Sequence, residues 1–292
     1  MKAPTLLLVA ALTSCVGPQP AATVARAEAA PFVVVSCNVR YGTAKDGADA
    51  WPARRDMLAA LLTAQQPTIL GVQEALAFQV EFLQQTLPHH QRIGIGRDGG
   101  DAGEFSALFV DARRFAVLEG GTFWLSPTPD VVGSVGWDAA LTRICTWARL
   151  RDRSDGRSLT VWNTHFDHRG AEARHQAAAM IAARVTRSGE PGLVLGDLNT
   201  GESSAPLATL RAAGLRDTFR DACATATQVG TFHAFRGGLA GDKIDFVLAT
   251  AGVDTLAATI LDQPGPNGRF VSDHHPVTAT LRLASGSLDR RQ

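Results

Sequence analysis

The segment "NTHFDHRG", Asn163–Gly170, follows the strand-like run "RSLTVW" and brings two histidines, an aspartate and an arginine close together in sequence. Polar side chains at the end of a strand are common in solvated turns, so the cluster indicates chemistry only if other segments supply partners that meet it in space. The fold and the chemistry therefore depend on whether other strands end in the same way.

Polar residues do end several other apolar, strand-like runs. Each of them alone could cap a strand or a turn, but together they indicate a shared site. Carboxylate and amide oxygens suit Mg²⁺, Mn²⁺ or Ca²⁺, and the absence of thiolate or histidine-pair spacing argues against structural zinc. The residues at these strand ends are Asn38, Glu74, His165, Asp197 with Asn199, Asp245 in "KIDF", and Asp273 with His274 in "VSDHHPV".

The hydrophobic periodicity predicts a strand-rich chain with helices in two batches. Because helices can cover a sheet only from outside, this pattern favours two packed sheets with helices on both outer faces. Helices are expected at 51–66, 77–87, 171–187 and 204–214, and strands at 31–39, 68–74, 91–96, 105–110, 115–126, 143–151, 158–166, 192–200, 242–250, 252–260 and 275–283.

Length and composition indicate one large globular domain, since the chain has 292 residues, of which 45% are hydrophobic and 19% charged. Its 28 basic and 28 acidic residues cancel, so nothing global marks a protein that coats nucleic acid or an anionic membrane. We expect a catalytic domain at 31–285 and a short C-terminal tail at 286–292.

The first thirty residues predict a signal peptide followed by a tether rich in alanine and proline. "LTSC" resembles the lipobox of bacterial lipoproteins, in which the cysteine, here Cys15, carries the lipid. "ARAEAAP" instead suits ordinary signal cleavage and a soluble secreted or periplasmic protein. An uncleaved cytosolic start is the third alternative.

The remaining cysteines, Cys37, Cys145 and Cys223, have no zinc-like spacing. Cys37 and Cys145 lie in apolar strand runs, which favours buried free thiols. A disulfide between these two stays an alternative in an oxidising compartment.

The joint set of motifs resembles the endonuclease/exonuclease/phosphatase superfamily, also called the deoxyribonuclease I-like fold. "SCNVRYG", "GVQE", "NTHFDHRG", "GDLN", "KIDFV" and "SDHHPV" occur in the order of that family over about residues 32–283. The resemblance implies a four-layer α/β/β/α sandwich, with two mostly antiparallel sheets face to face and helices on the outer faces. It also implies metal-dependent hydrolysis of phosphate esters.

The resemblance assigns metal and water chemistry to five residues. Glu74 is similar to the principal Mg²⁺ ligand, with Asn38 in support and Asp273 in the metal shell; Mn²⁺ is the alternative ion. Such a cation neutralises charge that grows on a phosphoryl oxygen in the transition state. Asp197 resembles the residue that orients or deprotonates the attacking water, and Asn199 the one that positions the phosphate.

The resemblance also assigns two histidines. His274 is similar to the imidazole that contacts the phosphate and is oriented by Asp245. His165 resembles a second histidine near the phosphate, a candidate for the acid that protonates the leaving group.

Five further residues are predicted to bind the substrate: Arg40, Arg143, Asp167, Arg169 and Arg236. Arg169 has the planar fork that suits a phosphate, and Asp167 is either a supporting partner or a further metal ligand. Arg143 and Arg236 would clamp a second anionic or hydroxyl-rich group if the aromatic residues near them, Trp137, Trp147 and Phe235, rim the pocket rather than fill the core.

The leading prediction is an exported, monomeric, Mg²⁺-dependent phosphoesterase that acts on a small or lipid-linked phosphate ester. A secreted endonuclease or exonuclease is the alternative, although neutral charge disfavours extended duplex binding and predicts no obligate nucleic-acid partner. A non-catalytic binding module on the same scaffold is a remote alternative, because none of the catalytic positions is replaced.

Overall fold

The computed structural model describes residues 29–284. The predicted leader up to residue 28, including Cys15, and the predicted tail at 286–292 lie outside the described residues. Within the described range, no helix combines the length and the apolar character needed to cross a membrane.

The first sheet has six strands in the order β11-β12-β1-β2-β4-β3. Strands β1 and β2 are parallel, and the other neighbours pair antiparallel. The strands are β1 (Phe32–Asn38), β2 (Ile69–Gln73), β3 (His90–Ile93), β4 (Leu108–Asp111), β11 (Val253–Ile260) and β12 (Val277–Leu283).

The second sheet repeats this plan with six strands in the order β5-β6-β7-β8-β10-β9. Strands β7 and β8 are parallel, and the other neighbours pair antiparallel. The strands are β5 (Phe115–Trp124), β6 (Ile144–Asp152), β7 (Ser158–His165), β8 (Gly192–Asp197), β9 (Arg216–Asp217) and β10 (Asp245–Ala249).

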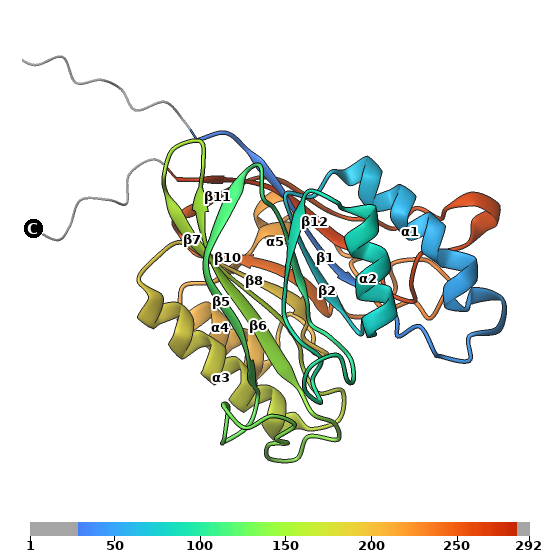
Figure 1. Cartoon of the computed structure of the whole chain (residues 1–292), viewed down its shortest axis with the longest axis horizontal. Coiled ribbons are helices and arrows are strands. Elements are labelled where there is room, and N and C mark those ends of the chain that lie inside the picture. The colour runs from blue at the N-terminus through green and yellow to red at the C-terminus, as the bar shows by residue number, and fades with distance from the viewer. Residues whose placement is uncertain (1–28, 285–292) are drawn as a thin grey trace, which may run out of the picture.

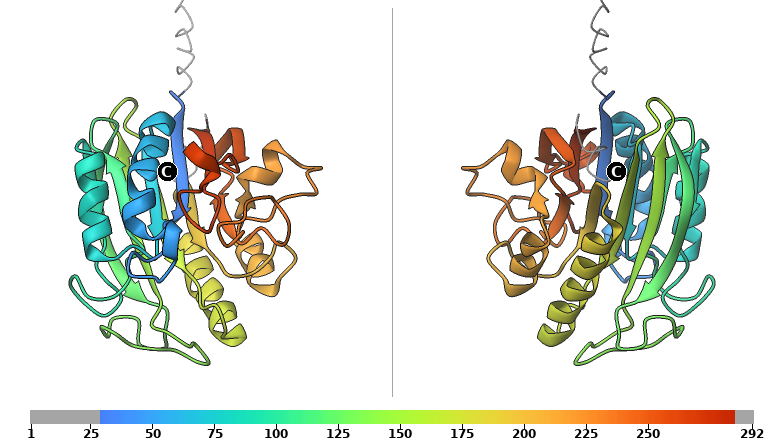
Figure 2. Two further views of the ribbon diagram at one scale, coloured as in Figure 1. Left: turned by 90° about the vertical axis from the view of Figure 1, so that its right-hand side faces the viewer. Right: turned by 90° about the vertical axis from the view of Figure 1, so that its left-hand side faces the viewer.

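Helices α1 and α2 lie outside the first sheet, and α3 and α4 lie outside the second (Figures 1 and 2). The short helix α5 instead contributes Phe219 to the core between the sheets. Their bounds are α1 (Trp51–Gln65), α2 (Ala77–Thr86), α3 (Ala171–Ser188), α4 (Ala205–Ala212) and α5 (Thr218–Ala222), with 3-10 turns η1 (Gly47–Asp49) and η2 (Pro266–Gly268). This arrangement confirms the predicted four-layer sandwich with mostly antiparallel sheets.

Side chains that alternate between the two faces of each sheet form three hydrophobic cores. Val34 points into the core between the sheets, whereas its neighbour Val35 packs toward α1 and α2. In the second sheet Val161 joins the central core, and Trp162 packs toward α3 and α4. Successive side chains of a strand point to opposite faces, so runs that are apolar at every position satisfy both layers.

Asn163, the first residue of the opening segment, joins the two sheets. Its amide nitrogen donates to the carbonyls of Val72 and Ala107, at 2.9 and 2.8 Å, and its Oδ1 accepts from Gln73 at 2.7 Å. A Cβ at Gly71 would lie 2.8 Å from Asn163 Oδ1, so the close approach requires glycine there. A fully bonded polar group in the core fixes the mutual position of the sheets.

Several predicted strands are too long or displaced. The strand predicted at 91–96 is β3 and ends before Gly94, which has φ +119°. The strand predicted at 105–110 begins only at Leu108, and that predicted at 242–250 begins only at Asp245. The short elements β9 and α5 were not predicted, because neither is long enough to produce a periodic pattern.

The alternative of a Cys37–Cys145 disulfide is wrong. Cys37 packs against α1 and α2, whereas Cys145 packs against α3, so the two thiols lie on opposite outer faces of the sandwich. Both are free, as is Cys223. Burial raises the pKa of Cys37 to about 12 and raises that of Cys145 as well, so both stay protonated at neutral pH.

Candidate active site

The two parallel strand pairs bring the predicted residues together. Asn38 ends β1 and Glu74 follows β2 in one sheet, while His165 ends β7 and Asp197 ends β8 in the other. The Asn38 amide donates to Glu74 Oε1 and to Asp197 Oδ2, each at 3.0 Å. One asparagine thus ties together carboxylates that come from different sheets.

These strand ends open into a cavity of about 370 Å³. A cavity of this size is within the range of small-molecule sites. It is lined by Arg40, Tyr41, Glu74, Glu104, Leu141, Arg143, His165, His168, Asp197, Asn199, Phe232, Ile244, Asp273 and His274.

Strand register places three further groups side by side. β8 lies between β7 and β10, so Asp197 is level with His165 on one side and with Asp245 on the other. His274 Nδ1 lies 2.9 Å from Asp245 Oδ2 and 3.8 Å from Asp197 Oδ2. His274 therefore lies between two buried carboxylates.

The close packing of these groups changes the pKa values of Asp197 and His274. Burial, together with the like charge of Asp245, raises the pKa of Asp197 to about 7. Burial disfavours the charged form of His274, but the carboxylates of Asp245 and Asp197 outweigh it and raise its pKa to about 10. At neutral pH His274 is therefore a cationic hydrogen-bond donor, and Asp197 can take up or release a proton.

His165 has the opposite character. Burial and the nearby charge of Arg143 lower its pKa well below the usual value, so it is neutral. Its Nε2 lies 2.9 Å from Asn199 Nδ2, whose amide also donates to the Phe166 carbonyl at 3.0 Å. A ring nitrogen that accepts from this amide carries no proton, so the geometry gives no support to His165 as the acid in this state.

The same turn geometry recurs at the ends of β1 and β8. Asn38 Oδ1 accepts from the Arg40 N–H, and Asp197 Oδ1 accepts from the Asn199 N–H, both at 2.9 Å. Arg40 and Asn199 have φ of 55° and 47°, and Glu74 has φ of 61°. Such left-handed backbone costs about 1 kcal/mol or more for a non-glycine residue and clusters at functional sites.

The donor set fits a hard divalent cation. Glu74 Oε2 accepts only a backbone N–H, that of Tyr41 at 3.1 Å, and Asp273 Oδ2 lies 3.6 Å from Arg40 Nε. Ligand atoms of Asp197, Asp245 and His274 also lie within 4.8 Å of one another. Because His274 Nδ1 is already bound to Asp245, the side of the cavity with Glu74 and Asp273 suits the cation better, and the Asn38 amide there holds Glu74 in place.

Two of the arginines predicted to bind substrate line the cavity. Arg40 forms an ion pair with Asp46 at 3.0 Å. Arg143 is buried, with Nε 3.4 Å from Asp167 Oδ2 and Nη2 3.1 Å from His168 Nδ1. Both guanidinium groups are therefore held in place before a substrate arrives.

Asp167 lies behind Arg143 and does not line the cavity. Its Oδ1 accepts from the Arg169 and Gly170 N–H groups at 2.9 and 2.7 Å. Burial acts in the other direction, but these N–H groups and Arg143 hold the pKa of Asp167 well below its usual range. The carboxylate orients Arg143 and the loop, which matches a supporting role rather than that of a metal ligand.

The structure does not bring Arg169 and Arg236 into the cavity lining; both are exposed. None of the aromatic residues predicted to rim the pocket lines this cavity: Trp137 is exposed, and Trp147 and Phe235 lie elsewhere. Trp147 lies on the outer face of the second sheet, and the ring of Phe235 lies 5.9 Å from the guanidinium of Arg54. Tyr41 and Phe232 line the cavity instead, and the Phe232 ring centroid is 5.1 Å from that of His274.

Sequence reasoning missed several lining residues, above all Glu104. Its carboxylate pairs with Arg97 at 2.8 Å, and burial raises its pKa. Glu104 lies in a loop without periodicity, so no pattern marked it. The other lining residues without a predicted role are Tyr41, Leu141, His168, Phe232 and Ile244.

A two-sheet sandwich with carboxylates and histidines at its strand ends matches the expectation of a hydrolase that acts on phosphate esters. The profile of the Endonuclease/Exonuclease/phosphatase family matches residues 35–274, and the chain belongs to this family.

Similar solved structures come from Bacteroides. A family member from Bacteroides vulgatus is 34% identical over 87% of this chain and 100% of that one, with a TM-score of 0.80. A member from Bacteroides thetaiotaomicron is 30% identical over 88% and 100%, with a TM-score of 0.82. A mannosyl-6-phosphatase of Bacteroides thetaiotaomicron is 30% identical over 86% and 99%, with a TM-score of 0.79. No curated protein matches the chain significantly.

Proposed function

We propose that this protein is a metal-dependent hydrolase that cleaves the phosphate ester of a compact, hydroxyl-bearing molecule. The observation that carries the proposal is the pair of bonds from Asn38 to Glu74 and Asp197, because it unites a cation-binding carboxylate with one placed to activate water. A Mg²⁺ or Mn²⁺ ion held by Glu74 and Asp273, with Asn38 orienting Glu74, would supply positive charge at a phosphoryl oxygen.

The side chains around the phosphate have separate roles in the proposed reaction. Asp197, with its pKa raised to about 7, accepts the proton of the attacking water. His274, kept charged by Asp245, donates to a phosphoryl oxygen, and the Asn199 amide orients the group. Arg40 and Arg143 add fixed positive charge at the cavity wall.

The composition of the cavity favours a small substrate. Glu104 lines the cavity, and Arg97 donates to it from outside the lining. A carboxylate held in this way suits sugar hydroxyls, whereas it repels a second phosphate of a polyanion. The similarity to a mannosyl-6-phosphatase supports a sugar phosphate.

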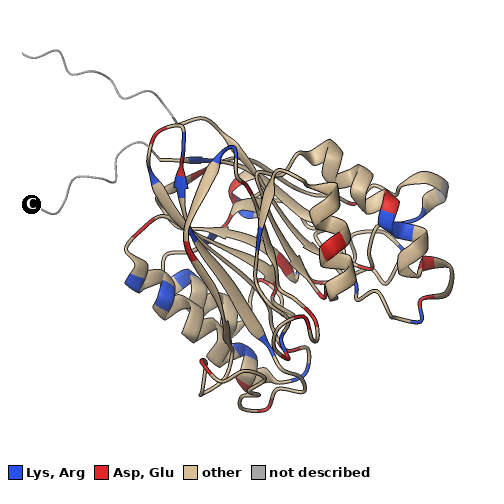
Figure 3. Ribbon diagram, in the orientation of Figure 1, with Lys and Arg blue, Asp and Glu red and all other residues tan. Residues whose placement is uncertain are grey.

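The alternatives receive less support. Figure 3 shows basic and acidic residues interspersed over the ribbon, and the 28 basic and 28 acidic residues cancel, so no excess of positive charge favours a nuclease. A binding module without chemistry would not need the buried pair of Asp245 and His274.

A panel of phosphoesters tests the proposed function. Hexose 6-phosphates, nucleotides, a phosphodiester and plasmid DNA are assayed with Mg²⁺, with Mn²⁺ and with excess EDTA. We expect turnover of a small ester that disappears on chelation and returns with added metal. Unchanged turnover in EDTA would contradict the metal dependence. Efficient cleavage of plasmid DNA with little activity on small esters would favour the nuclease alternative instead.

Glu104→Gln tests the recognition of hydroxyl groups. We expect this substitution to raise KM for a sugar phosphate about tenfold and to leave kcat within a few-fold, because the lost charge weakens binding in the ground state and the transition state alike. Glu81→Gln, at an exposed position of helix α2, is the matched control. An unchanged KM for every hydroxyl-bearing ester would remove Glu104 from substrate binding.

We further propose that the chain is exported and held at a membrane by a lipid on Cys15. The support is the "LTSC" sequence alone. Cys15→Ala is expected to move the protein from the membrane fraction to the soluble fraction. Labelling of both proteins with a radioactive fatty acid checks that the wild type carries the lipid and the variant does not. A mature protein cleaved near Ala30, with no incorporated lipid, would instead establish soluble export.

A further inference from the structure

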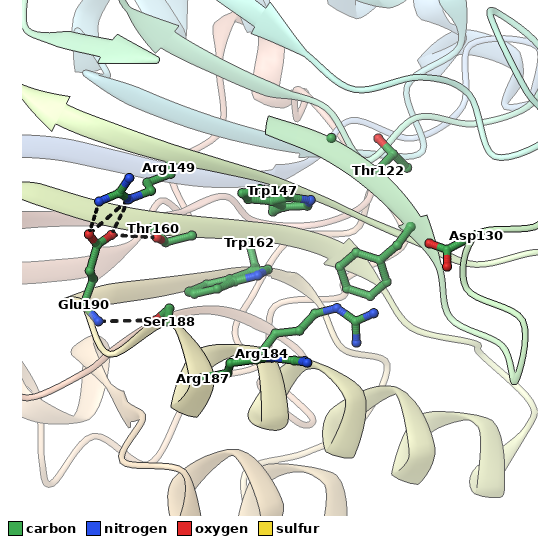
Figure 4. Close-up of a pocket in the computed structure, with 12 residues that line it drawn as sticks. Thr122, Asp130, Trp147, Arg149, Thr160, Trp162, Arg184, Arg187, Ser188 and Glu190 are labelled. Carbon is green, nitrogen blue, oxygen red and sulfur yellow. Dashed lines mark hydrogen bonds and ion pairs between the residues drawn. The ribbon is translucent and has the colours of Figure 1, made fainter. Parts of the chain in front are cut away.

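A second cavity, of about 580 Å³, lies on the outer face of the second sheet, between strands β5 to β7 and helix α3 (Figure 4). It shares no lining residue with the active-site cavity. Its residues come from strands of the sheet, from the segment after β5 and from the C-terminal half of α3. The active site lies near the other end of α3, close to Asp167. The chemistry of the reaction therefore does not explain this cavity.

Two tryptophans form the floor. Trp147 on β6 and Trp162 on β7 are cross-strand partners, and Figure 4 shows them next to each other in the middle of the cavity. Trp162 is almost fully buried, whereas Trp147 is only half-buried. On the neighbouring strand β5, Gly121 pairs with Trp147, and a Cβ there would lie 3.4 Å from the indole nitrogen. The glycine leaves the edge of the indole uncovered.

One wall of the second cavity carries hydrogen-bond donors and acceptors that hold one another in place. Arg149 Nε lies 3.0 Å from each carboxylate oxygen of Glu190, and Arg149 Nη2 lies 2.6 Å from Oε1. Thr160 Oγ1 donates to the same carboxylate at 3.4 Å. The dashed lines of Figure 4 show this network beside the tryptophans. Such a bidentate pair holds both partners in a defined orientation.

The other wall comes from α3 and the segment after β5. The Arg184 guanidinium lies 3.9 Å from the centre of the Phe123 ring and donates to the Met180 carbonyl at 3.1 Å. Arg187, one turn further along α3, and Asp130 are exposed at the rim. The cavity therefore presents both basic and acidic groups around an aromatic floor.

From this arrangement we propose that the second cavity binds a carbohydrate chain. One face of a sugar ring consists of C–H groups that pack on the electron-rich face of an indole. Its hydroxyl groups donate and accept hydrogen bonds at once, which matches a rim with Arg149, Arg187, Glu190 and Asp130. The proposal does not depend on the proposed hydrolase function.

The mixed charge of the rim argues against other ligands. A single nucleic-acid strand stacks its bases on aromatic side chains, but its phosphates would meet the carboxylates of Glu190 and Asp130. A lipid chain or apolar peptide would cover the Arg149 and Glu190 pair without satisfying its remaining hydrogen bonds. A hydroxyl-rich sugar can both pack on the tryptophans of the floor and form hydrogen bonds with the charged groups of the rim.

Binding is tested with the full chain, a microarray of neutral and acidic oligosaccharides, and a dT10 oligonucleotide. We expect a group of oligosaccharides to bind and to quench tryptophan fluorescence. Trp147→Ala is expected to weaken binding of the best oligosaccharide at least about tenfold, since a buried aromatic anchor contributes most of the affinity of such a site. Arg187→Ala, at an exposed position, is the second variant and should weaken binding by a smaller factor.

Trp137→Ala is the matched control, because Trp137 is exposed and lies outside this cavity. It should leave the affinity unchanged, and no variant should alter kcat on a small phosphoester. Three results would overturn the proposal: no oligosaccharide binds; binding is the same in Trp147→Ala and Arg187→Ala as in the wild type; or only dT10 binds in a manner that depends on Trp147.

Discussion

Replacement of Asp197 by asparagine is expected to lower kcat about 10²–10⁴-fold at saturating Mg²⁺, because the variant cannot accept the proton of the attacking water. Asparagine keeps the size of the side chain, and its Oδ1 can still accept the Asn199 N–H. Only the bond from the Asn38 amide to Oδ2 is lost, because an amide nitrogen takes the place of that oxygen. The loss should therefore appear in turnover, and the metal concentration for half-maximal activity should change little.

Glu74→Gln provides the contrast. Glu74 holds no proton in the proposed reaction, but it supplies negative charge to the cation, so the metal concentration for half-maximal activity should rise about 10–100-fold. Activity at saturating metal should recover in part. Full Mg²⁺ titrations of both variants measure the difference, and identical curves would contradict the division of roles between Glu74 and Asp197.

The stability of Asp197→Asn separates lost chemistry from lost structure. The folded pKa of Asp197, about 7, is above the ordinary aspartate value of 3.8 that applies to the unfolded chain. The folded state therefore binds more protons between these values, and stability falls as pH rises through this window. Removing the carboxylate should remove that loss. We expect the variant in EDTA to have a Tm at pH 8 no lower than the wild type, with the difference shrinking toward pH 4.

The sequence was informative about the site because the polar residues lie at strand ends. Asn38, His165 and Asp197 each end a run of buried residues, and both parallel pairs place these ends at the same edge. Parallel strands direct their carboxyl ends alike, which brings together within each sheet the strand ends that the local pattern had marked. The register that sets Asp197 between His165 and Asp245 was not visible in the pattern.

The substrate-binding residues were harder to predict because they depend on loop paths. Trp147 is four residues from Arg143, about 13 Å along an extended strand, so it lies away from the strand end that forms the site. In "FHAFRGG" the backbone turns at Ala234 and Phe235, with φ of 49° and 62°. This turn leaves Phe232 at the cavity and carries Arg236 to the solvent.

His274→Ala and Asp245→Asn are expected to be strongly non-additive. His274→Ala removes the charged donor and should lower kcat about 10²–10⁴-fold. Asp245 acts through the imidazole it holds at 2.9 Å, so the double variant should be about as slow as His274→Ala alone. A double variant whose loss equals the product of the single losses would show that the two residues do not work as a unit.

The pH dependence of Asp245→Asn distinguishes this electrostatic role from a merely structural one. In the wild type the carboxylates of Asp245 and Asp197 overcome burial and keep His274 charged up to about pH 10. Without Asp245 the pKa of His274 should fall toward its usual value, so kcat should decline at a lower pH than in the wild type. NMR titration of the His274 ring measures the shift directly. A ring that titrates alike in both proteins would mean that Asp245 contributes packing and not charge.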